Sequence, residues 1–165
     1  RNRLLAAGVP VAQTLQAYLR RSAADLAPII GSGGMVRLVK GAFADPGQHA
    51  FQHRAEIDGN YLALARMMLA PEAKASGFRP VFGTHDDKLM PRIREIAQAN
   101  GWRPGEYGFE MLYGVRPELQ RQLRDAGEQV RLYLPFGRDW WPYAVRRVGE
   151  SPRNFMLLAR TLLGS

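Results

Sequence analysis

The sequence predicts an α/β fold with the strand–helix alternation of a TIM-like (β/α)8 barrel. Five apolar, strand-like runs alternate with helical patterns, and no hairpin turn joins two of them, which indicates parallel pairing. The 165 residues divide into five units of about 33, close to the roughly 31 per unit of a ~250-residue barrel. An open doubly wound sheet has the same alternation. The barrel is favoured because no G-x-G-x-x-G turn follows a strand, and because polar residues lie at strand C-terminal ends.

Each strand is expected where a short apolar run is closed by turn residues. The first run follows Gly8 and Pro10, the second ends before Pro46-Gly47, and the last is stopped by Pro135 and Gly137. The expected strands are residues 10–19, 35–43, 79–84, 107–113 and 130–134.

Helices are expected between and after these strands, from their capping residues. Ser22 is a candidate N-cap with Asp25 three residues later, Pro117 suits a first helical turn, and Asp139 is a candidate N-cap for a helix after the last strand. Glycines follow several of the predicted C-termini. The expected helices are residues 2–7 (the tail of a helix), 22–30, 48–75, 91–99, 117–126, 139–148 and 152–163.

Composition limits the class of protein. Apolar residues make up 46% and charged residues 23%, which are ordinary globular values and argue against a disordered chain. The absence of cysteine excludes disulfides, and we expect no metal site, because the three histidines do not form a ligand pattern with the acidic residues. No apolar run approaches the ~20 residues of a membrane span and no signal peptide is visible, so we expect a cytoplasmic protein.

The net charge of +8 raises the question of a nucleic-acid partner. The arginines are dispersed, however, and no run of five basic residues occurs. We therefore expect no nucleic-acid binding; the charge fits equally well with a phosphate-bearing cofactor and an acidic substrate.

The segment 129–151 carries the clearest candidate binding site. On the helix predicted after Asp139, Tyr143 precedes Arg146 and Arg147 by three and four residues, and Glu150 follows them at the same spacing. Two guanidinium groups on one side of a helix can hold a small carboxylate. The alternative is a solvated face with an exposed ion pair, which contributes about 0.3–0.5 kcal/mol.

A second group of polar residues interrupts the strands. Arg37 and Lys40 lie in the run MVRLVKGAF, where strand geometry places Arg37 on the face of Val39 and Gly41, and Lys40 on the opposite face. Buried unpaired charge is costly, so each needs a partner or access to solvent. The simpler interpretation of Lys40 is a strand-end lysine whose charged group extends to solvent. Gly41 would allow close approach of a planar group.

Six segments, in this order, resemble proline dehydrogenases, the flavin enzymes that oxidise L-proline. They are LQAY at Leu15, RLVKGA at Arg37, THD at Thr84, FEMLYG at Phe109, LYLPFG at Leu132 and YAVRR at Tyr143. Phe43 replaces the tyrosine that usually follows K-G-A, and Asp86 replaces an asparagine, so we do not assign Asp86 to the cofactor.

The resemblance implies FAD as cofactor and L-proline as substrate, with 1-pyrroline-5-carboxylate as product and a quinone as electron acceptor. Arg37 would lie beside the flavin ring as the catalytic residue. The remaining flavin contacts would be Gln16, Lys40, Gly41, Ala42, Thr84 and His85. The carboxylate of proline would bind Arg146 and Arg147, in a pocket shaped by Leu112, Tyr133 and Tyr143.

The family barrel has eight strands, so the resemblance implies that residues 1–165 form a single domain that is its C-terminal part, roughly strands 4–8. It also leaves open a pyrroline-5-carboxylate dehydrogenase partner and a peripheral contact with the inner membrane. Two other functions stay open from the residues themselves: a Schiff-base aldolase that uses Lys40 on an anionic substrate, and a basic nucleic-acid module.

Overall fold

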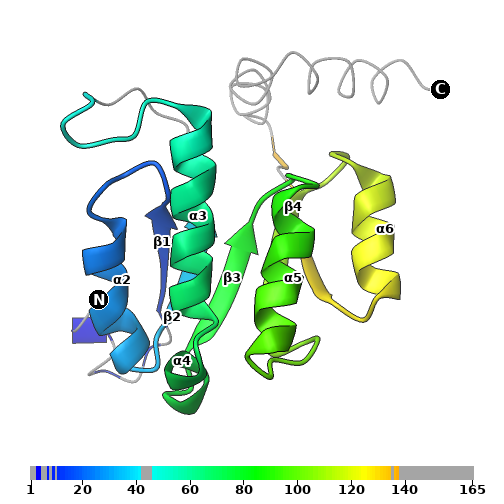
Figure 1. Ribbon diagram of the computed structural model, residues 1–165. Coiled ribbons are helices and arrows are strands. Elements are labelled where there is room, and N and C mark those ends of the chain that lie inside the picture. The colour runs from blue at the N-terminus through cyan, green and yellow to red at the C-terminus, as the bar shows by residue number, and fades with distance from the viewer. Residues whose placement is uncertain are drawn as a thin grey trace.

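The computed structural model describes residues 3–4, 7, 9, 11–41, 46–134 and 136–137. Strands and helices alternate along these residues (Figure 1), with a second short helix before the third strand. In chain order the elements are β1 (Ala12–Gln16), α2 (Ser22–Gly31), β2 (Met35–Val39), α3 (Arg54–Met68), α4 (Pro71–Ala75), β3 (Arg79–Gly83), α5 (Leu89–Ala99), β4 (Gly108–Leu112), α6 (Pro117–Asp125) and β5 (Gln129–Tyr133). The helices predicted at 139–148 and 152–163 lie outside the described residues.

The five strands form one parallel sheet in the order β1-β2-β3-β4-β5, so each strand pairs with the next one along the chain. The helices lie over one face of this sheet (Figure 1). A doubly wound sheet reverses its strand order at a switch point and carries helices on both faces. The sequential order is that of a barrel wall, which confirms the TIM-like prediction.

The hydrophobic core fills the space between the sheet and its helices. Alternate strand residues point into it, among them Val36, Leu38, Phe82 and Phe109, each 0% exposed. Tyr61 on α3 packs against them from the helix layer. The intervening strand residues, such as Thr14, Arg37 and Glu110, therefore lie on the face away from the helices, which we call the open face.

Two predictions of local structure are wrong. Ser22 is the first residue of α2 and not its cap, because its Oγ donates to the Gln16 carbonyl at 2.6 Å. The predicted helix at 48–75 is two helices, α3 and α4. The chain before α3 instead runs beside the end of β1, where Phe51 N donates to the Tyr18 carbonyl at 2.8 Å, and Pro71 begins α4 after a break at Leu69 and Ala70.

Candidate functional site

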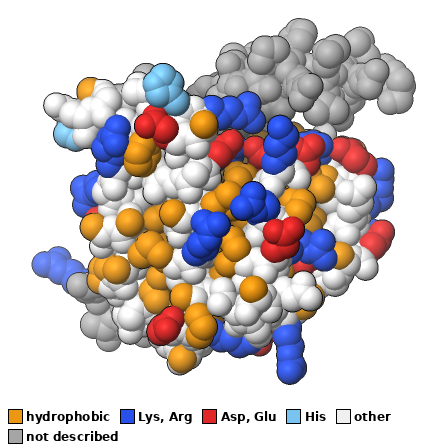
Figure 2. Space-filling view, viewed as in Figure 1, with side chains coloured by type: hydrophobic (Ala, Val, Ile, Leu, Met, Phe, Trp, Pro, Cys, Tyr) orange, Lys and Arg blue, Asp and Glu red, His pale blue; other side chains and the backbone are white. Residues whose placement is uncertain are grey.

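The C-terminal ends of the strands bring together the predicted site residues that the structure describes. The register aligns Gln16 with Val39, and Val39 with Gly83, so that Lys40-Gly41 and Thr84-His85 leave neighbouring strands at one level. Leu112 is the register partner of Tyr133 at the same edge. This edge lies uppermost in Figures 1 and 2, and acidic and basic side chains alternate along it in the space-filling view.

Arg37 takes part in a row of charges on the open face. Its Nε donates to Glu110 Oε2 at 2.5 Å, and Arg131 Nη1 lies 3.5 Å from Glu110 Oε1. These residues belong to β2, β4 and β5, so the row also passes over β3 and spans four strands. Strand geometry predicted the face of Arg37 correctly, and the carboxylate that pairs with it was not identified from the sequence.

Lys40 is held by two carboxylates at the rim. Its Nζ donates to Asp86 Oδ2 at 2.7 Å and forms an ion pair with Asp58. Desolvation raises the pKa of Asp86, but hydrogen bonds from Lys40 Nζ and from two backbone N–H groups outweigh it, and the pKa lies below its usual value. Asp86 is therefore ionised and neutralises Lys40, which explains how a carboxylate is accommodated at this position.

The histidine at the end of β3 is a neutral hydrogen-bonding group. Leu112 N donates to His85 Nε2 at 2.7 Å, so the ring proton is on Nδ1. Burial lowers the pKa of His85 to about 4, and the positive charges of Arg116 and Arg37 add to the effect. Thr84, 5% exposed, accepts a hydrogen bond from Asp86 N at its Oγ1. His85 can thus offer an Nδ1–H donor to a ligand, but not a positive charge.

Gly41 is required by its surroundings within the chain. Its φ is +100°, a conformation that L side chains rarely adopt. A Cβ at this position would lie 2.1 Å from Tyr18 Cδ1, which belongs to a ring only 7% exposed. The structure therefore gives a reason for this glycine that does not depend on a ligand.

Helix α3 fixes the ends of β1 and β2. Asn60 Nδ2 donates to the Ala17 carbonyl at 2.6 Å, and Tyr61 Oη donates to the Leu38 carbonyl at 3.1 Å. Complete burial raises the pKa of Tyr61, so the hydroxyl stays protonated. Residues 58–61 of α3 thus support the site by holding both strand ends and by supplying Asp58 to Lys40.

Four of the predicted site residues lie outside the described residues: Ala42, Tyr143, Arg146 and Arg147. Tyr133 and Leu112 are described and lie side by side at the sheet edge, where Tyr133 is 56% exposed.

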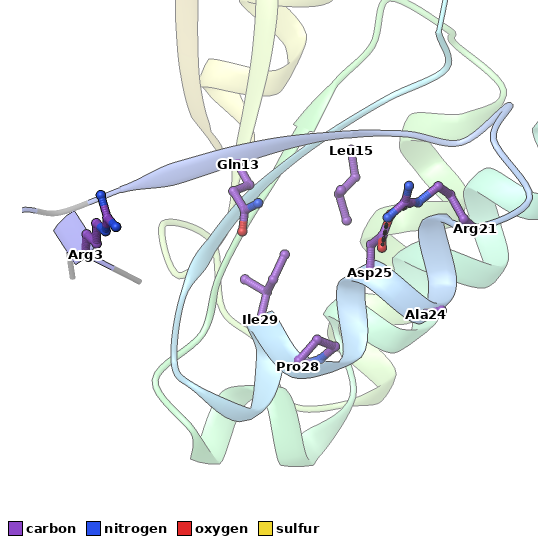
Figure 3. Close-up of a pocket in the computed structure, with 8 residues that line it drawn as sticks. All are labelled: Arg3, Gln13, Leu15, Arg21, Ala24, Asp25, Pro28 and Ile29. Carbon is purple, nitrogen blue, oxygen red and sulfur yellow. Dashed lines mark hydrogen bonds and ion pairs between the residues drawn. The ribbon is translucent and has the colours of Figure 1, made fainter. Parts of the chain in front are cut away.

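An open groove elsewhere on the molecule includes none of the predicted site residues. It lies between β1 and α2, where Gln13 and Leu15 face Pro28 and Ile29, and an Arg21–Asp25 ion pair closes one side (Figure 3). Within the described part of the chain, no group of three or more His, Cys, Asp or Glu side chains could hold a metal ion. The helices that the structure describes also lack the length and apolar character needed to cross a bilayer.

Comparison with known proteins gives consistent matches. A family model described as "Proline dehydrogenase" matches residues 2–157. The chain is 37% identical over 153 residues to proline dehydrogenase of Deinococcus radiodurans, covering 93% of this chain and 48% of that protein. It is 35% identical over 144 residues to proline dehydrogenase 2 of Bacillus subtilis, covering 87% and 46%. The chain thus spans about half the length of these relatives.

Solved structures agree with these sequence matches. Proline utilization A (PutA) from Bdellovibrio bacteriovorus, inactivated by N-propargylglycine, superposes with a TM-score of 0.75 at 28% identity, covering 83% of this chain and 16% of that one. A PutA variant from Bradyrhizobium japonicum gives a TM-score of 0.70 at 26% identity, covering 88% and 17%.

Proposed function

The chain belongs to the proline dehydrogenase family, and we propose that the complete protein oxidises L-proline to 1-pyrroline-5-carboxylate with FAD as cofactor. The match over residues 2–157 carries this proposal. The five strands would be the fourth to eighth of a (β/α)8 barrel, as the order of the family motifs implies, and the relatives are about twice as long as this chain.

The donors at the strand ends suit a flavin with a diphosphate arm. Arg37 provides a fixed positive charge on the open face, and His85 offers its Nδ1–H at the rim. The remaining contacts would come from Gln16, Lys40, Gly41, Ala42 and Thr84. Lys40 would act within its carboxylate pair, so its net contribution toward phosphate is smaller than that of a free lysine. When bound, FAD accepts the hydride equivalent that leaves the proline ring.

The substrate pocket would lie above Leu112 and Tyr133, which are register partners at the site edge of the sheet. We assign Arg146 and Arg147 to the proline carboxylate and Tyr143 to the pocket wall. A planar guanidinium can make two parallel hydrogen bonds to a carboxylate, which fixes the orientation of the substrate as well as its affinity. Arg37 would stabilise the negative charge that develops on the flavin ring while proline is oxidised.

Electrons would pass from the reduced flavin to a quinone. To reach a quinone in the inner membrane, the protein would be cytoplasmic and would contact that membrane peripherally. The PutA relatives suggest a pyrroline-5-carboxylate dehydrogenase as the next enzyme, which consumes the product.

Two alternative functions are less well supported. A Schiff-base aldolase needs an uncharged amine in an apolar pocket, whereas Lys40 Nζ forms ion pairs with two carboxylates. A nucleic-acid module needs a continuous basic surface, whereas acidic and basic side chains are interspersed on the face seen in Figure 2.

The decisive experiment is to purify the complete protein and add L-proline without oxygen. We expect a bound flavin whose visible absorbance is bleached by L-proline. Arg37→Ala should weaken flavin binding or slow the bleaching, whereas Arg79→Ala, which removes an exposed arginine from the opposite end of β3, should do neither. A colourless protein on which borohydride traps a carbonyl substrate at Lys40 would overturn the proposal.

A further inference from the structure

A glutamate on the open face of the sheet occupies the centre of the charged row described above. Glu110 lies in the middle of β4, with Arg37 of β2 on one side and Arg131 of β5 on the other. Its side chain is 24% exposed, and both of its oxygens face an arginine. A carboxylate between two arginines in this way orients both guanidinium groups and reduces the net positive charge of the three residues.

Glycine in β3 makes the contact with Arg37 possible. The order β2-β3-β4 means that the Arg37 side chain must cross β3 to reach Glu110. It crosses at Gly83, where an added Cβ would lie 3.1 Å from both Cζ and Nη2 of Arg37 and 2.9 Å from Val39 Cγ1. The guanidinium thus lies close against the sheet, drawn toward β4 and away from the strand that carries it.

We propose that Glu110 is the positioning residue for Arg37: it holds the guanidinium across β3 and limits the positive charge that the row presents to the flavin. The inference rests on the proposed function for the identity of the ligand. The row contains two arginines and one glutamate, so its formal charge is +1 with Glu110 present and +2 without it.

Two variants of the complete protein separate the two parts of this role. Glu110→Gln keeps an oxygen that can accept from Arg37 Nε but removes the charge, and Glu110→Ala removes both. In Glu110→Gln we expect the reduced flavin to be favoured over the oxidised flavin by about tenfold more than in the parent, a rise of about 30 mV in the two-electron potential. In Glu110→Ala we expect slower reduction by proline in addition, because Arg37 is no longer held in place.

A double-mutant cycle shows whether Glu110 acts through Arg37. In an Arg37→Ala background, Glu110→Ala should slow reduction by proline much less than in the parent background, whereas independent effects would add. Glu110→Gln removes the same charge in both backgrounds, so its rise in potential should persist. Glu106→Gln is the matched control, since it removes a glutamate that pairs with Lys74 near the N-terminal end of β4, away from the C-terminal strand ends. It should leave the flavin potential unchanged.

The outcomes are distinct. A flavin-containing parent whose potential and reduction rate are the same in both Glu110 variants would overturn this inference and leave the proposed function intact. An equal slowing of reduction by Glu110→Ala with and without Arg37 would also overturn it. A parent that binds no flavin would overturn both. If Glu110→Ala does not fold, the isosteric Glu110→Gln still decides the question through the flavin potential.

Discussion

Replacing Gly41 by alanine tests whether this glycine serves the cofactor or the fold. The added Cβ would lie 2.1, 2.6 and 2.9 Å from three atoms of the Tyr18 ring. That ring is 7% exposed and has little space to move. The φ of +100° at Gly41 adds strain that is independent of the ring.

The two effects can be assigned magnitudes. A non-glycine residue at a positive φ of this kind costs about 1–2 kcal/mol, and forcing an extra carbon into a packed site costs about 1–3 kcal/mol. We therefore expect Gly41→Ala to lower the free energy of unfolding by about 2–5 kcal/mol. Gly59→Ala is the control, because Gly59 lies within α3 with no atom near its Cβ position, and there alanine should stabilise by about 0.5–1 kcal/mol.

The assay is urea unfolding of the complete protein after its flavin has been removed, followed by titration with FAD. The reasoning from Tyr18 requires a lower urea midpoint in the flavin-free state for Gly41→Ala. If the flavin-free variant unfolds at the parent midpoint and loses only its affinity for FAD, the glycine serves the cofactor, and the argument from the Tyr18 ring is refuted.

Three further changes test separate parts of the site. Tyr61→Phe removes the hydrogen bond to the Leu38 carbonyl and should cost about 0.5–1.5 kcal/mol of stability in urea unfolding, with little effect on proline oxidation. The pKa of His85 is about 4 in the folded protein and 6.5 in the unfolded chain, so only the unfolded chain takes up a proton between these pH values. The free energy of unfolding should therefore fall by up to about 3 kcal/mol from pH 6.5 to pH 4. His85→Gln should flatten this part of the stability profile. Arg146→Lys or Arg147→Lys should lower kcat/KM for proline by roughly tenfold to 150-fold, because one charge-assisted hydrogen bond is worth about 1.5–3 kcal/mol, while flavin stays bound; losses under twofold would remove these arginines from the carboxylate site.

The sequence identified the elements of the fold because their signals are local. Each strand is a short apolar run, and Arg37 could be assigned to the face opposite Val36 and Leu38 from strand periodicity alone. Strand ends were less well predicted: residues 17–19 continue the apolar run of β1, but they lie in the turn beyond it, where Ala17 and Tyr18 are buried.

The partners of the charged residues could not be predicted, because they depend on which strands and helices become neighbours. Glu110 was visible as an acidic residue in an apolar strand, yet its pairing with Arg37 spans 73 residues of sequence. The contact between Asp58 and Lys40 was not predicted, because Asp58 reaches Lys40 from a helix whose start was placed too early.

The sequential strand order also determines how far the chain must travel to build each part of the sheet. Register partners of β1 and β2 are Ala12 and Met35, and those of β4 and β5 are Gly108 and Gln129, whereas Met35 pairs with Arg79 across the two helices α3 and α4. Closing that longer loop costs only about 0.6 kcal/mol more for a doubling of length.

Most contacts can therefore form as each strand–helix unit is added to the one before it. The Arg37–Glu110 ion pair is different, because it needs β2, β3 and β4 in place together. It would form only after β4 has joined the sheet, and its formation would report that three consecutive strands have assembled in register.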